Sequence, residues 1–213
     1  MERDEKWAVI AARRRELADL LAGLPEAEWE RPSLCTEWRV RDVAAHVALT
    51  PQSPGMLRIL AAGARAGGDL QAVNRDLART HARRPTTRLV AELRELADSR
   101  ARPAITTLDN LLFDVLVHVQ DVALPLGRTA PMPLAAAREG LDRVWRMGWP
   151  FWARRRFRGA RLVATDIGWI AGDAGGAEVR GPAEALLLLL TGRRAAALPR
   201  LAGDGLAHLA GPA

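Results

Sequence analysis

The sequence predicts a mainly α-helical bundle over residues 1–155, followed by a small α/β domain over residues 156–213. Up to about residue 155, apolar residues recur every three or four positions in segments that proline and glycine separate, as in amphipathic helices. After residue 158, the stretch ARLVATDIGWIAG alternates and is rich in β-branched and aromatic residues, which is typical of strands. The 213 residues suffice for a main domain with a small companion.

The predicted bundle begins with a helix over residues 3–23, where Trp7 and Leu17 lie on one apolar face. A connecting loop is expected over residues 25–35. The helical pattern resumes over residues 38–50 and ends where two prolines break it. Further helices are expected over residues 56–66, 69–83, 87–100, 105–124 and 133–152. Helices in such close succession predict a bundle.

In the predicted C-terminal domain, a glycine-rich turn over residues 172–176 separates the first strand pattern from AEVRG, a short returning strand. The next stretch, PAEALLLLLTGRRAAALPRLAG, has helical composition, with Pro182 in its first turn and Gly192 near a stop. Strands followed by a helix predict a small α/β unit after the bundle.

The net charge of +6 and the pI near 11.1 favour binding to nucleic acid at first sight. Lys6 is the only lysine, however, and most arginines alternate with alanine, leucine and acidic residues, as on solvated helix faces. The densest basic stretch runs from Arg154 to Arg161, beside Trp152 and Phe157. No reader motif accompanies it, so we expect a solvated helix end and no nucleic-acid partner.

The composition also predicts where the protein resides. The first residues, MERDEKWAVIAARRREL, carry charges where a signal peptide needs an apolar core, and the leucine run at 186–190 is too short to span a bilayer. Cys35 is the only cysteine, which fits a reducing compartment and excludes a framework of internal disulfides. We therefore expect a cytoplasmic protein without membrane association.

A polar stripe interrupts the most apolar predicted helix. Asp114, His118 and Asp121 are spaced four and then three residues apart, which places them on one helical face. His46 lies on another apolar helix, so it meets Asp114 and His118 if the two helices are neighbours in the bundle. Two histidines and a carboxylate, with positions left open, form the ligand set of a catalytic zinc site and also suit nickel or iron.

Spacing alone leaves a second interpretation open, in which His118 is a core histidine and Asp114 is its hydrogen-bond partner. Asp121 could either orient a metal-bound imidazole or cap the helix end. The remaining candidates are weaker: His81 is expected at an exposed helix end, His208 near a frayed carboxyl terminus, and Cys35 as a small buried apolar residue.

Three stretches resemble one family. EWERPSLCTEWRVRDVAAHV is similar to the N-terminal signature of the mycothiol-dependent maleylpyruvate isomerase family, a branch of the DinB-like metal-binding helical bundles. LLFDVLVHVQDVALPLG resembles the second metal motif of that family, and DIGWIAGDAGGAEVRGPAEALLLLLTGR resembles its small C-terminal domain. The resemblance therefore implies a DinB-like four-helix bundle, with a small α/β C-terminal domain that closes a cleft.

The resemblance also implies a ligand set and a chemistry. Carried over, the metal ligands fall on His46, Asp114 and His118, with zinc as the first choice of divalent metal. The isomerase itself has Glu at the acidic position, and Asp114 is one methylene shorter. The cosubstrate is mycothiol, a low-molecular-weight thiol whose thiolate attacks an electrophilic small molecule. The outcome is either cis–trans isomerisation or S-transfer, and the motifs do not choose between them.

An arginine of the family's C-terminal domain meets the anionic substrate, and the LTGR stretch places this role on Arg193, with Arg180 as second choice. At a helix end, Arg193 equally fits a role in neutralising the helix dipole. The chain has no tyrosine, so no phenol acid is available, although Trp149, Trp152 and Trp169 could wall the cleft.

Three hypotheses follow from the sequence. The first is a metal-dependent, mycothiol-using S-transferase or isomerase. The second is a non-catalytic metal-binding bundle that acts as a sensor or as a partner-binding module. The third is a nucleic-acid accessory protein that uses the Arg154–Arg161 stretch. The sequence does not identify the electrophile, the metal or the oligomeric state.

Overall fold

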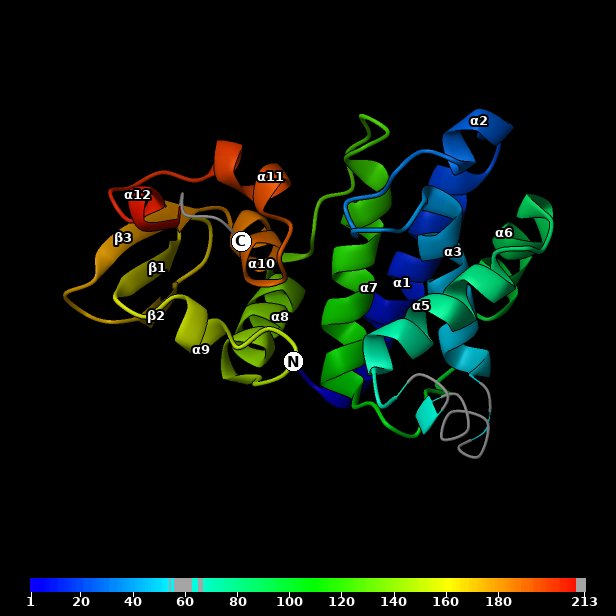
Figure 1. Ribbon diagram of the computed structural model, residues 1–213, viewed down its shortest axis with the longest axis horizontal. Helices are drawn as coiled ribbons and strands as arrows, with labels where there is room; N and C mark the ends of the chain where they lie inside the picture. Colours follow the sequence, from blue (N-terminus) through cyan, green and yellow to red (C-terminus); the bar gives the residue numbers. More distant parts are fainter. Residues whose placement is uncertain (54, 56–62, 65–66, 210–213) are drawn as a thin grey trace. The chain divides into compact units, whose positions relative to one another are not determined.

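The computed structural model describes residues 1–53, 55, 63–64 and 67–209 (Figure 1). Its contacts divide the chain into two compact units, Glu2–Ala130 and Pro131–Ala213, with Met1 joining the second. The sequence placed this boundary near residue 155. The difference arises because helix α8 (Leu134–Arg146) buries its apolar face against α10 (Ala183–Leu190) and so belongs with the C-terminal unit.

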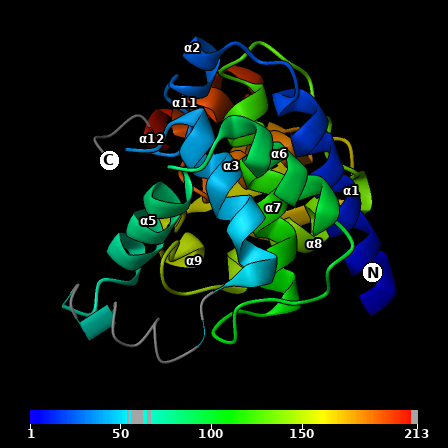
Figure 2. The same ribbon diagram turned by 90° about the vertical axis from the view of Figure 1, so that its right-hand side faces the viewer.

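The N-terminal unit is the predicted helical bundle. Its four main helices are α1 (Arg3–Leu21), α3 (Val40–Leu49), α6 (Thr86–Glu95) and α7 (Leu108–Ala123). Helix α1 packs against α7 and α6, and α3 packs against α6 and α7. Figure 2 shows these helices side by side. Most residues of α7 are buried, as its nearly continuous apolar sequence predicts for a helix that other helices surround.

Shorter elements complete this unit. Helix α5 (Leu70–His81) packs on α3, while α2 (Glu26–Trp29) lies within the predicted loop over residues 25–35. A 3₁₀ turn, η1 (Thr50–Gln52), ends α3 at the predicted proline break. The helix predicted over residues 56–66 lies outside the described residues, apart from 63–64.

Local signals set where the site-bearing helices begin. Thr107 caps α7, because its hydroxyl accepts a hydrogen bond of 3.1 Å from the backbone N–H of Asn110. At the start of α3, the carboxylate of Asp42 accepts a 2.9 Å bond from the backbone N–H of Arg39. Both helices therefore begin where their sequences supply side-chain partners for free backbone groups.

The C-terminal unit contains the predicted α/β structure. Strands β1 (Ala160–Ala164), β2 (Trp169–Gly172) and β3 (Ala177–Gly181) form a sheet in the order β2-β1-β3, antiparallel for β1–β2 and parallel for β1–β3. Gly172 has φ +96°, and a Cβ there would lie 2.1 Å from the carbonyl oxygen of Ala160, so only glycine fits this close approach.

Helices complete the C-terminal unit. The almost wholly buried α10 packs on α8 and contacts β1 and β3. The short elements are α9 (Ala153–Arg156), α11 (Arg194–Ala197), η2 (Leu198–Arg200) and α12 (Leu206–Leu209). The helix predicted over residues 133–152 ends at Arg146, before Gly148 and Pro150. In the described part of the chain, no helix combines the length and apolarity that crossing a membrane requires.

Candidate metal centre

Helices α3 and α7 bring three potential metal ligands together. His46 comes from α3, whereas Asp114 and His118 lie one turn apart on the same face of α7. The Nε2 atom of His46 lies 3.2 Å from Oδ2 of Asp114, and the Nε2 atom of His118 lies 3.3 Å from its Oδ1. One donor atom from each residue lies within 4.8 Å of the other two, so a single ion can contact all three.

The three side chains differ in their access to solvent. The imidazoles of His46 and His118 are buried, because both helices are packed on the faces that carry them. The side chain of Asp114 is 30% exposed. The cluster is therefore closed on the imidazole side and open on the carboxylate side, where a small molecule can approach.

The charges of the cluster suit a cation. Burial raises the pKa of Asp114, but the two neighbouring imidazoles outweigh burial and hold it well below its usual range. Burial likewise lowers the pKa of His118, but the charge of Asp114 and the hydrogen bonds that His118 donates to Asp114 and Asp121 raise it to about 9. Without an ion, the cluster thus holds a carboxylate and an imidazolium, and a divalent cation would replace the proton of His118.

Asp121 orients the imidazole of His118. Its fully buried carboxylate accepts a 2.8 Å hydrogen bond from Nδ1 of His118, which leaves Nε2 directed toward Asp114. This is the arrangement in which a carboxylate fixes the tautomer and plane of a metal-binding histidine. Of the two roles that the sequence left open for Asp121, the hydrogen bond favours orientation.

Asp121→Asn is expected to raise the Kd for a divalent ion by about tenfold to a hundredfold, because an amide accepts the Nδ1 hydrogen bond more weakly than a carboxylate does. Competition with a chromophoric chelator measures this Kd. Asp42→Asn is the matched control, since Asp42 is also buried but pairs with Arg39 rather than with a site imidazole. Equal affinities in the two variants would contradict the role of Asp121.

Trp38 covers both imidazoles. Its indole stacks on His118 with an interplanar angle of 4° and a centroid distance of 5.9 Å, and it meets the ring of His46 edge-on at 5.2 Å. Sequence analysis missed this residue. Trp38 lies in the loop before α3, which begins at Val40, so helical spacing relative to His46 gives no signal for it.

The donor set fits a divalent transition metal. Two imidazole nitrogens and one carboxylate oxygen are ligands that zinc accepts, and nickel or iron can be held in the same way. Three protein ligands leave at least one coordination position for water or for a substrate. The buried partner of His118 supplies the supporting hydrogen bond that such sites need.

The predicted arginines lie in the C-terminal unit. Arg193 follows α10, and its Nη1 donates a 2.7 Å hydrogen bond to the carbonyl of Thr191 at the helix end. Arg180 lies on β3 with an exposed side chain. A substrate-binding role for either arginine remains a prediction. The tryptophans predicted to wall a cleft differ among themselves: Trp149 and Trp152 are exposed, whereas Trp169 is buried and donates to Asp142.

Two of the minor candidates have different surroundings from those expected. His81 is buried and lies 2.7 Å from the fully buried carboxylate of Glu92, so the prediction of an exposed helix end was wrong. Arg84 and Arg88 also pair with Glu92, which makes this cluster an ion network that joins α5 to α6. Cys35 is half-buried.

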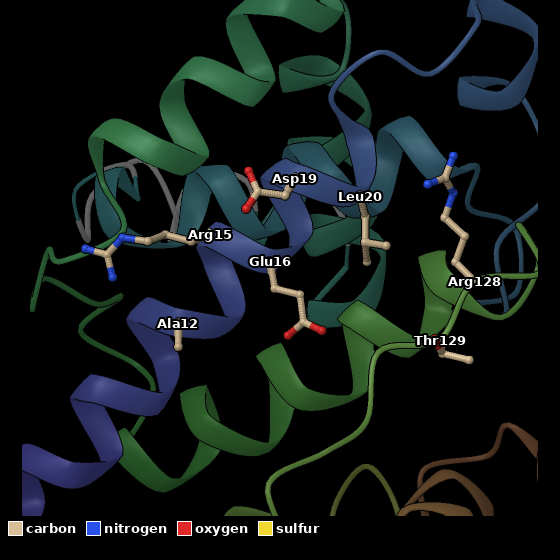
Figure 3. Close-up of a pocket in the computed structure, with 7 residues that line it drawn as sticks. All are labelled: Ala12, Arg15, Glu16, Asp19, Leu20, Arg128 and Thr129. Carbon is tan, nitrogen blue, oxygen red and sulfur yellow. The ribbon is translucent and has the colours of Figure 1, made fainter.

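A separate groove of about 570 Å³ lies along the C-terminal half of α1, next to Arg128 and Thr129 (Figure 3). Its acidic residues already have cationic partners, because Glu16 pairs with Arg13 and Asp19 pairs with Arg94. None of its lining residues belongs to the candidate metal centre. The groove therefore adds no ligand to that centre.

Comparison with known proteins relates this chain to one family model and this fold to solved structures. The family model described as the mycothiol maleylpyruvate isomerase N-terminal domain matches residues 10–104. A solved structure of the mycothiol-dependent maleylpyruvate isomerase aligns over 96% of this chain and 93% of its own, with 17% identity and a TM-score of 0.66. A histidine-to-alanine mutant of that isomerase aligns over the same shares, with 16% identity and a TM-score of 0.64. No curated protein sequence matches. At these identities, the structural likeness shows a shared fold.

Proposed function

We propose that this chain, whose residues 10–104 match the mycothiol maleylpyruvate isomerase N-terminal domain, is a metal-dependent enzyme that uses a thiol. The thiol, with mycothiol as first choice, attacks an electrophilic small molecule. One observation carries the proposal: His46, Asp114 and His118 converge within 4.8 Å in the bundle core, with the carboxylate side open.

The three side chains would hold one divalent ion, with zinc as first choice, through Nε2 of each histidine and a carboxylate oxygen of Asp114. Such an ion, when bound, lowers the pKa of a coordinated thiol so that the thiolate forms near neutral pH. Asp121 keeps the Nδ1 proton on His118, and Asp114 leaves an open side for the cosubstrates.

The thiolate sulfur then forms a bond to an electrophilic carbon. In an isomerisation, this bond converts a cis double bond into a single bond, rotation follows, and cleavage of the same carbon–sulfur bond restores the double bond as trans and returns the thiol. In an S-transfer, the carbon–sulfur bond persists and another group leaves with the electron pair. The site supports either outcome, because both begin with the same attack.

Arg193 is our proposed binding residue for a substrate carboxylate, with Arg180 as second choice, because a guanidinium can contact a carboxylate through two parallel hydrogen bonds. Arg193 already donates to the Thr191 carbonyl through Nη1, so other guanidinium N–H groups would have to meet the substrate. The cytoplasmic location expected from the sequence also remains a prediction.

The test is an assay with maleylpyruvate as the first electrophile, chosen because the structurally similar enzyme is named for it. We expect conversion to the trans isomer, or formation of a thioether adduct, only when both the metal-loaded protein and the thiol are present. Metal-stripped protein and the His118→Ala variant serve as controls. Conversion at an unchanged rate without thiol, or after removal of the metal, would overturn the proposal.

A further inference from the structure

We propose that Trp38 is a positioning residue for the metal centre, an inference that rests on the proposed metal binding. The indole of Trp38 lies parallel to the ring of His118 and edge-on to the ring of His46. The two imidazoles also meet each other edge-on, with their centroids 4.8 Å apart. One buried indole therefore contacts both histidines and restricts the planes in which their Nε2 atoms can lie.

A strained turn aims the indole. Glu37, directly before Trp38, has φ +65°, a left-handed conformation that is uncommon for residues other than glycine. Two arginines of α5 hold this turn: Nη2 of Arg79 donates to the backbone carbonyl of Glu37 at 2.6 Å, and Nη1 of Arg75 donates to its carboxylate at 2.8 Å. Such conformations persist where surrounding contacts fix them, often beside functional sites.

The same loop is also fixed to the site-bearing helix. The backbone N–H of Leu34 donates to the carbonyl of Asp121, the residue whose carboxylate orients His118. Within the loop, the N–H and hydroxyl of Ser33 both donate to the carbonyl of Trp38, each at 2.9 Å. The segment 33–38 is thus anchored to α7 through Leu34 and to α5 through Glu37, and Trp38 directly follows the second anchor.

This arrangement has two consequences for a bound ion. The imidazoles need little reorientation on binding, because the indole and Asp121 already hold them. The indole also covers ring surface that water would otherwise reach, so exchange of the ion occurs past the exposed carboxylate of Asp114. Loss of the indole should therefore weaken binding, speed dissociation and alter the coordination geometry.

The experiment compares Trp38→Ala and Trp38→Phe with the native protein. Zinc affinity is measured by chelator competition, and coordination geometry is measured from the visible absorption bands of the cobalt-substituted protein. We expect the Kd of Trp38→Ala to rise on the order of tenfold, with altered cobalt bands, and we expect Trp38→Phe to recover most of both properties. Trp7→Phe is the matched control, since Trp7 is equally buried on α1 and should change neither property.

A second variant tests the turn without touching the core. The Arg75→Ala, Arg79→Ala double variant removes two side chains at the surface, so it should fold, but it releases Glu37. We expect a Kd several-fold above native, whereas Arg94→Ala, which breaks a surface pair with Asp19, should leave the Kd unchanged. If Trp38→Ala does not fold, this double variant decides.

The outcomes separate this inference from the proposed function. If the native protein binds no divalent ion, the proposed function fails first. If the native protein binds zinc but Trp38→Ala and the double variant match it in Kd and in cobalt spectrum, the positioning role is overturned while metal binding stands.

Discussion

Replacing His118 with alanine is expected to raise the Kd for zinc by roughly a hundredfold or more. Structural zinc sites provide about 10–16 kcal/mol of binding energy over four ligands, so one ligand accounts for about 3 kcal/mol. His118 pairs with both Asp114 and Asp121, and the other histidine of the cluster, His46, already supplies a donor of its own and so does not replace it. Chelator competition at fixed pH measures the change.

The matched control for this variant is His81→Ala. His81 is also buried and also pairs with a carboxylate, that of Glu92, but it belongs to the ion network of α5 and α6. This control should lose stability and keep the native Kd for zinc. Native affinity in His118→Ala would mean that His118 is a hydrogen-bonded core residue, which is the second interpretation that its sequence spacing allows.

The second large effect is a dependence of zinc affinity on pH. The neighbouring carboxylates raise the pKa of His118 to about 9, despite its burial, so the ion must displace a proton at neutral pH. The Kd should therefore fall by roughly tenfold between pH 7 and pH 8. Isothermal titration or chelator competition, corrected for the protonation of the chelator, measures this slope. A Kd that is constant over this range would contradict the account.

The same pKa predicts that stability changes with pH in opposite directions for two contributions, that of His118 in the metal-free protein and that of bound zinc. Since the folded pKa of His118 lies above its ordinary value of about 6.5, its contribution to the metal-free protein is fully present below about pH 6.5 and is lost as pH rises through about 9. With saturating zinc, stabilisation by the ion instead increases with pH, because the Kd falls. Urea unfolding over this pH range, without zinc and with saturating zinc, measures both trends in the free energy of unfolding. Comparison with the His118→Gln variant isolates the part that His118 contributes.

Much of the fold follows from local patterns. The apolar periodicity of α1, α3 and α7 and the alternation in β1 predict the helical bundle and the small α/β unit, and the structure confirms both. The end of α8 and the boundary between the two units do not follow from local patterns. They depend on which surface the apolar face of α8 meets, and periodicity reveals such a face without identifying its partner.

The candidate site shows the same limit. Spacing alone puts Asp114, His118 and Asp121 on one face of α7, but the approach of His46 needs α3 and α7 to be neighbours. Trp38 escaped attention because stacking on an imidazole leaves no periodic signal in a sequence. His81 was misjudged because its arginine neighbours suggested exposure, whereas His81 and one of those neighbours, Arg84, pair with Glu92, a buried glutamate eleven residues after His81.

The central claim is a metal centre with a position that a thiol can occupy. The most direct measurement is the absorption spectrum of the cobalt-substituted protein during a titration with mycothiol. The account predicts a saturable sulfur-to-cobalt charge-transfer band that is absent in His118→Ala. A cobalt spectrum that does not change as the thiol is added would show a coordination sphere closed to thiols and would contradict the account.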